Sequence, residues 1–86
     1  MPEICRFYGV VIRIYFADHS PPHFHAHYGE AEALISISDL RVLAGSLPAR
    51  ALGLVMEWAF QHRDEIMQCW DRAAAHESPG KVEPLP

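Results

Sequence analysis

The sequence predicts an α+β fold, in which a small antiparallel β-meander of four to five strands packs against one long or broken C-terminal α-helix. Three observations support this prediction. Short segments with a two-residue apolar period fill the first half of the chain, with glycine, proline or aspartate between them. Apolar residues then recur at three- and four-residue steps from residue 48 to about 75. With 86 residues, the chain fits one domain, which we place at residues 1–77.

The expected strands follow one another through short turns. Val10–Phe16 is apolar on both faces, which is typical of a central strand. Gly9 precedes this strand at a tight reversal, and a loop stiffened by two successive prolines follows it. The expected strands are Ile4–Tyr8, Val10–Phe16, Phe24–Tyr28, Ala31–Ile37 and, as a short fifth strand, Asp39–Ala44.

The helical segment follows Gly45-Ser46-Leu47-Pro48, where Ser46 is a suitable N-cap and proline is tolerated in the first turn. A straight helix from Pro48 to Ala75 would be about 42 Å long, whereas a domain of this size is roughly 30 Å across. We therefore expect a break near Gln61–Asp64. The alternative is an overhanging end that packs on a second subunit in a symmetric dimer. The proline-rich residues 78–86 are expected to form a disordered tail.

The composition narrows the class of protein. The 7 basic residues are outnumbered by 11 acidic ones, and the net charge of −4 disfavours a nucleic-acid partner. No apolar run reaches the roughly 18–20 residues of a membrane span, and no secretory signal is visible at the N-terminus. The distant Cys5 and Cys69 are expected to be reduced, buried thiols. Together these features predict a cytoplasmic protein without a membrane partner.

The chemically informative segment is Asp18–Glu30, which is rich in histidine. If residues 23–28 are extended, the alternation of side chains places His23, His25 and His27 on one face of the strand. Two neighbouring imidazoles in such a row can converge on one divalent metal ion such as zinc, whereas the third needs a bulge. A further ligand must then come from elsewhere, and the candidates are Asp18, His19, Glu30, Glu32 and His62.

Three interpretations of this row remain open. It is a solvated sheet face with no chemical role, a catalytic or ligand-binding site, or a metal site formed by His23, His25 and His27. In the catalytic interpretation, the candidate residues form a hydrolytic or acid–base centre, in which Arg13 holds an anion across the sheet. These candidates are Asp18, His19, His23, His25 and Arg13.

Two groups of residues resemble a known family. The first is Arg6-Phe7-Tyr8-Gly9-Val10, Ile14-Tyr15-Phe16, Asp18-His19, Pro21-Pro22-His23-Phe24-His25 and Tyr28-Gly29. The second is Gly45-Ser46-Leu47-Pro48, Arg50-Ala51-Leu52, Trp58, His62 and Trp70. Over roughly residues 1–76 the chain is similar to the bacterial domain of unknown function 4160. This resemblance implies a small cytoplasmic protein encoded beside a partner, in a toxin–antitoxin-like pair. It implies no established activity, and it favours the His23 and His25 pair over a three-histidine site.

Whether the protein is an enzyme stays open on this reasoning. The leading hypothesis is a protein–protein interaction module that acts with an operon-encoded partner, or as a homodimer through its long helix and exposed sheet edge. The alternative is a histidine-based metal-binding or hydrolytic site on the Pro-Pro-His-Phe-His segment, with a divalent metal such as zinc as its cofactor. A ribonuclease-like toxin is a third hypothesis, which the acidic charge disfavours.

Overall fold

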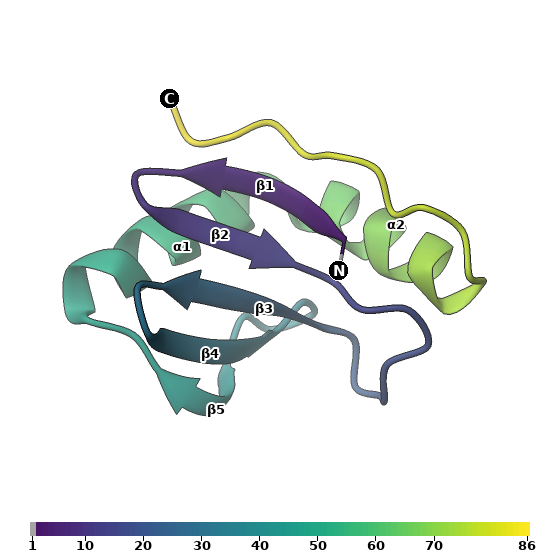
Figure 1. Ribbon diagram of the computed structural model, residues 1–86, viewed down its shortest axis with the longest axis horizontal. Helices are drawn as coiled ribbons and strands as arrows, with labels where there is room; N and C mark the ends of the chain where they lie inside the picture. Colours follow the sequence, from purple (N-terminus) through teal and green to yellow (C-terminus); the bar gives the residue numbers. More distant parts are fainter. Residues whose placement is uncertain (1) are drawn as a thin grey trace.

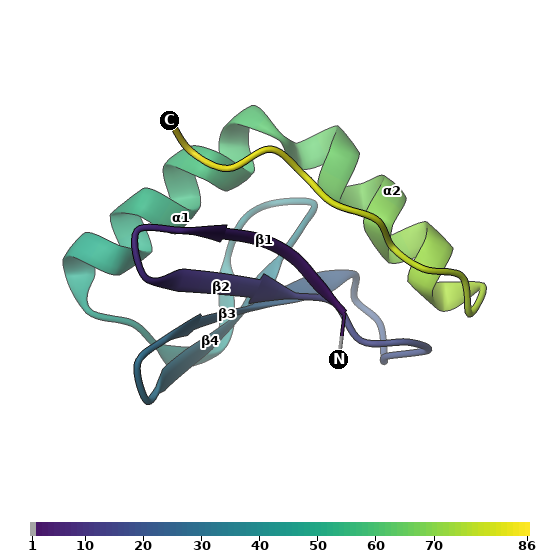
Figure 2. The same cartoon turned by 45° about the horizontal axis from the view of Figure 1, so that its top comes forward.

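The computed structural model describes residues 2–86. A five-stranded antiparallel sheet, with the strands in sequence order, is followed by two helices that cover one of its faces (Figures 1 and 2). The predicted α+β meander with a broken C-terminal helix is therefore confirmed. The elements are β1 (Glu3–Phe7), β2 (Val10–Arg13), β3 (His23–Tyr28), β4 (Ala31–Ser36), β5 (Val42–Ser46), α1 (Ala49–Gln61) and α2 (Arg63–Ala74).

The hydrophobic core lies between the sheet and the helices. Trp58 on α1 is fully buried there, and its ring packs against Phe7 at 5.5 Å and Phe24 at 5.8 Å between centroids. Alternate residues of the central strands point the same way because successive side chains leave opposite faces of a strand. The fully buried sheet residues on this side include Val10, Ile12, Phe24, Ala26, Ala33 and Ile35. The histidines of β3 lie on the opposite face of the strand.

The helical segment breaks at His62, inside the range where the length argument predicts a break. The backbone N–H of His62 donates to the carbonyl groups of Trp58 and Ala59, which ends α1, and α2 begins at the next residue. The break keeps both helices over a molecule that measures 33 × 26 × 23 Å. Within residues 2–86, no helix combines the length and the apolar character that crossing a membrane requires.

Several strand boundaries differ from the sequence prediction by one or two residues, and two differ by three. The strand β2 ends at Arg13 rather than Phe16, and β5 begins at Val42 rather than Asp39 because a turn at residues 37–39 and two further loop residues precede it. Ser46 belongs to β5 and does not cap the helix, whose N-cap position is Pro48 without a side-chain hydrogen bond. Gly45 allows β5 to pair closely with β4. Its φ is +75°, and a Cβ atom there would overlap the backbone oxygen of Glu32.

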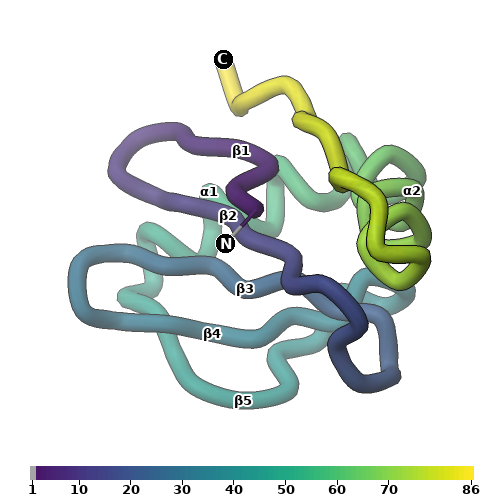
Figure 3. Tube along the Cα trace, turned by 45° about the vertical axis from the view of Figure 1, so that its right-hand side comes forward, coloured from purple at the N-terminus to yellow at the C-terminus, as the bar shows by residue number. Residues whose placement is uncertain are grey.

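The last residues of the chain run along β1 and the helices, although the sequence predicts a disordered tail at residues 78–86 (Figures 1 and 3). The backbone N–H of Val82 donates to the Ile4 carbonyl group at 2.8 Å, and the indole N–H of Trp58 donates to the Glu83 carbonyl group at 2.8 Å. Val82 and Leu85 are buried. Composition did not predict this packing. Val82 and Leu85 become ordered only through their contacts with the rest of the fold, which composition does not reveal.

Candidate functional site

The three histidines of β3 share one face of the sheet, as the alternation predicts. This strand is central and pairs with β2 on one side and β4 on the other, so its backbone is held extended. The ring centroids of His23 and His25 lie 5.1 Å apart, and those of His25 and His27 lie 6.4 Å apart with nearly parallel planes. Phe24 and Ala26 point the opposite way, into the core.

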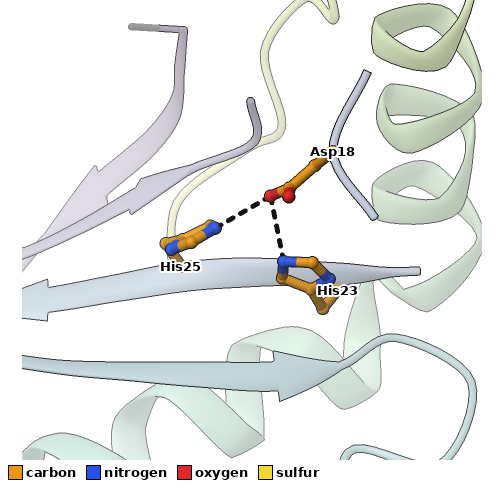
Figure 4. Close-up of side chains that lie close together, drawn as sticks. All are labelled: Asp18, His23 and His25. Atoms are coloured by element: carbon orange, nitrogen blue, oxygen red, sulfur yellow. Dashed lines mark hydrogen bonds and ion pairs between the residues drawn. The ribbon is translucent and has the colours of Figure 1, made fainter. Parts of the chain in front are cut away.

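The loop between β2 and β3 brings Asp18 onto the first two histidines. Its carboxylate oxygen Oδ2 lies 3.0 Å from Nε2 of His23 and 3.2 Å from Nε2 of His25 (Figure 4). The backbone N–H of His19 donates to the other oxygen, Oδ1, at 2.8 Å. The loop is tied to the end of α2 by a hydrogen bond from the Ala17 N–H to the Ala73 carbonyl group. Helix α2 therefore helps to set the position of the carboxylate.

The second nitrogen of each ring also has a partner. Nδ1 of His23 lies 2.8 Å from the Pro21 carbonyl oxygen, and Nδ1 of His25 lies 2.9 Å from Oε2 of Glu32. A carbonyl oxygen and an ionised carboxylate only accept hydrogen bonds, so each Nδ1 must carry a proton. In a neutral ring, the Nε2 atom that faces Asp18 then carries a lone pair instead of a proton.

Two aromatic side chains enclose the pair of rings. Trp70 of α2 packs against His23 at 5.3 Å between centroids, and Tyr15 meets the His25 ring edge-on at 4.3 Å. As a result, only 7% of the His23 side chain and 11% of the His25 side chain are exposed. The sequence did not link Trp70 to the histidines, because helical periodicity does not say which strand residue a helix meets. In the expected strand Val10–Phe16, alternation places Tyr15 on the same face as Arg13, and this was a usable signal.

The aspartate is ionised in this setting. Burial raises the pKa of Asp18, but the hydrogen bond to His25 and the backbone N–H of His19 outweigh that effect. The pKa of Asp18 therefore lies below its ordinary value, and the carboxylate carries its charge at neutral pH.

The remaining candidate ligands lie apart from this cluster. The His19 side chain is exposed, and only its backbone hydrogen bonds to Asp18. His27 lies further along β3, where its Nε2 atom is 3.7 Å from Oε2 of Glu32. His62 hydrogen bonds to Glu65 at the helix junction, and Glu30 is an exposed residue of the β3–β4 turn.

Arg13, the last residue of β2, lies directly opposite His25 in the ladder between β2 and β3. Its Nε atom is buried and has no hydrogen-bond partner in the described part of the chain. Arg13 therefore lies beside His25 on the histidine face of the sheet, and no hydrogen bond or ion pair found among residues 2–86 joins it to Asp18.

The cysteines take no part in this cluster. Cys5 and Cys69 are both buried and unbonded to each other, as expected. Burial raises the pKa of the Cys5 thiol to about 11, so it is protonated at neutral pH and a poor nucleophile or ligand.

The cluster of Asp18, His23 and His25 has the composition of a metal site. Its three ligand atoms all lie within 4.8 Å of one another. Two imidazole nitrogens and one carboxylate oxygen are a common protein ligand set for zinc, and three such ligands leave a coordination position open for water or substrate. The chemistry available to the cluster is thus that of an open metal centre or of a histidine–aspartate acid–base pair.

Comparisons with known proteins identify a family but no activity. No curated protein and no solved structure matches the chain. A family model described as a domain of unknown function, DUF4160, matches residues 9–71. The matched segment runs from the turn before β2 to α2, and it includes Asp18, His23 and His25. The chain therefore belongs to the DUF4160 family, as its Pro-Pro-His-Phe-His segment predicted.

Proposed function

We propose that the protein binds a divalent transition-metal ion, with zinc as the first choice, through Asp18, His23 and His25. The observation that carries this proposal is the convergence of two ring nitrogens on one carboxylate oxygen, at 3.0 and 3.2 Å, while both Nδ1 atoms are already engaged as donors. In a tetrahedral zinc site with bonds of about 2.0–2.1 Å, neighbouring ligand atoms are about 3.3 Å apart. The observed separations are close to that value.

The charges favour a cation between these three atoms. If both rings were neutral, each Nε2 lone pair would face an ionised carboxylate oxygen, which is repulsive. Protonating one ring leaves the lone pair of the other ring facing the carboxylate. Protonating both places two positive charges in neighbouring rings, whose centroids lie 5.1 Å apart and whose side chains are about nine-tenths buried. A divalent ion takes the place of both protons and attracts all three ligand atoms.

The partners of the Nδ1 atoms also support a metal site. Histidines that bind metals almost always donate their other N–H to a carboxylate or a backbone carbonyl group, which sets the tautomer and the ring orientation. His25 has Glu32 in this role and His23 has the Pro21 carbonyl group. In a neutral ring, this arrangement leaves Nε2 as the nitrogen with a lone pair that can bind a metal.

We further propose that the centre is hydrolytic. A metal ion held by three protein ligands lowers the pKa of a bound water to about 7 and polarises an oxygen atom of a substrate. In such a reaction the water oxygen bonds to the attacked atom, the scissile bond breaks, and the leaving group takes up a proton. The aromatic walls from Trp70 and Tyr15 restrict bulk water around the histidines, which strengthens electrostatic interactions there.

Metal titration of the chelator-treated protein tests this proposal. Calorimetry should show one zinc or cobalt ion per chain, and cobalt should quench the fluorescence of Trp70, whose ring lies 5.3 Å from His23. The Asp18→Asn variant keeps the side-chain shape but loses a charged ligand, so its affinity should fall by at least the roughly 10–100-fold that loss of an outer-shell partner costs. The matched control is His76→Gln, which removes an exposed imidazole and should bind as the wild type does. Absence of binding at micromolar metal, or equal losses in both variants, would overturn the proposal.

A second proposal concerns the free edge of the sheet. We infer that two copies of the chain pair through β5, all five of whose residues are exposed, including Val42 and Leu43. An exposed edge strand pairs readily with another chain, and the edge at β1 is covered by the C-terminal residues. The same edge would suit the toxin–antitoxin-like partner that the family resemblance implied. Sedimentation equilibrium at micromolar concentration should show a dimer that Leu43→Lys dissociates. A strictly monomeric wild type contradicts pairing between copies.

A further inference from the structure

We propose that the sheet face beside this centre binds the phosphoryl group of a small phosphate monoester, with Arg13 as the residue that holds it. This inference rests on the proposed metal site and names the class of its substrate. It starts from Arg13, a half-buried arginine at the end of β2 whose Nε atom has no hydrogen-bond partner among residues 2–86. Buried polar groups are normally hydrogen-bonded, so an unpaired one indicates a missing acceptor.

The acids nearest to Arg13 are engaged elsewhere. Glu3 is its neighbour in the β1–β2 ladder, but both oxygens of Glu3 bond to Arg6, at 2.8 and 3.1 Å. Glu32 is directed at His25 instead. Within residues 2–86, no carboxylate approaches Arg13 closely enough to form an ion pair. The guanidinium thus keeps its full set of donors available beside the histidine row.

His27 adds a second unpaired group on the same face. Its Nε2 atom is buried without a hydrogen-bond partner in the described chain, and its ring is stacked parallel to that of His25. An imidazole N–H at this position can donate a hydrogen bond to a bound oxygen atom.

The donor set favours a phosphoryl group over a carboxylate. The planar fork of a guanidinium bonds two oxygens of one anion at the same time. A phosphate monoester has three non-ester oxygens, so that one can face the metal while two face Arg13, whereas a carboxylate has only two in all. With Asp18, Glu32, a divalent ion and Arg13 together, the centre carries a net positive charge. The overall charge of −4 disfavours a polyanion such as RNA.

The test measures binding of phenyl phosphate to the zinc-loaded full chain by calorimetry and ³¹P NMR. The wild type should bind it, Arg13→Gln should bind at least tenfold more weakly, and Arg13→Lys should fall between the two because it keeps the charge without the fork. Arg41→Gln is the control, since Arg41 is an exposed arginine whose side chain is 77% accessible. Zinc affinity is measured in parallel and should be the same in all four proteins, which also shows that the variants are folded.

The outcomes separate this inference from the metal site. If zinc binds but phenyl phosphate does not, or if Arg13→Gln and Arg41→Gln bind it equally, the phosphoryl site is wrong and the metal site stands. If zinc does not bind, both fall. Tighter binding of a short RNA than of phenyl phosphate would overturn the assignment to a small monoester.

Discussion

The carboxylate of Glu32 on β4 lies 2.9 Å from Nδ1 of His25 on β3, although the residue directly opposite Glu32 in the ladder is His27. Diagonal neighbours across an antiparallel pair are about 7–8 Å apart at Cα, which a glutamate side chain can span. The same oxygen is 3.7 Å from Nε2 of His27. Glu32 therefore hydrogen bonds to His25 and only lies near His27, and the orientation of His25 depends on the register between β3 and β4.

This contact predicts the effect of removing the charge of Glu32. In Glu32→Gln an amide replaces the carboxylate, so the hydrogen bond to His25 loses its charge and the ring becomes a weaker ligand. We expect zinc affinity to fall about tenfold or more, as for other outer-shell partners of metal-binding histidines. Calorimetry on Glu30→Gln, which changes an exposed residue of the turn just before β4, provides the control. Equal affinities for the two variants would show that Glu32 does not support the ligand.

Replacing Gly45 should destabilise the fold. The added Cβ of Gly45→Ala would overlap the Glu32 backbone oxygen at a φ of +75°, a conformation that alanine adopts at a cost. We expect urea unfolding to show a loss of about 2 kcal/mol or more. Gly53→Ala is the matched control, because its Cβ would meet nothing within 4 Å and it lies inside α1. That variant should gain up to about 1 kcal/mol, and a similar loss in both would contradict this account.

The metal-free protein should lose stability as the pH falls through the ordinary histidine pKa of about 6.5, in part because of His27. The pKa of His27 is lowered in the fold, chiefly by burial, so the unfolded chain takes up a proton before the folded chain does. Proton uptake then favours unfolding between pH 6.5 and the lowered value. The His27→Gln variant lacks this pH-dependent contribution to stability.

Chemical unfolding in the presence of a chelator measures the effect at pH 8.5, 7.5 and 5.5. The stability of His27→Gln relative to the wild type should be the same at the two higher values, where both states of the histidine are neutral. At pH 5.5, the variant should be more stable relative to the wild type than it is at the two higher pH values. A constant difference at all three values would mean that His27 is not held neutral by the fold.

Removal of residues 79–86 should weaken the core. The deletion exposes apolar surface that Val82 and Leu85 cover, and it leaves the buried indole N–H of Trp58 without its acceptor. Burial of each apolar side chain contributes about 1.5–3 kcal/mol, so we expect a loss on the order of 3 kcal/mol, with a red shift of Trp58 fluorescence. Pro84→Ala changes an exposed residue of the same segment and should have little effect. An unchanged unfolding midpoint after the deletion would contradict the packing.

Local patterns were enough to predict most of the sheet and the break in the helix. The period of two in residues 23–28 predicts an extended strand with three histidines on one face, and β3 has that form. The predicted fifth strand was displaced by several residues, since its position depends on pairing with β4 and on the close backbone approach at Gly45. The composition of residues 78–86 predicts disorder. Their order comes from contacts with Ile4 and Trp58, which are distant in the sequence.

By itself, the sequence determined the meander, the helix that must break to fit its domain, and the pair of imidazoles two residues apart. These follow from backbone geometry, which repeats along a strand or helix whatever the rest of the chain does. Only the tertiary structure decided among the acidic candidates, bringing Asp18 onto both rings and Glu32 behind one of them. The distance between segments depends on strand register and on the path of a loop held by α2, and both result from packing summed over the whole molecule.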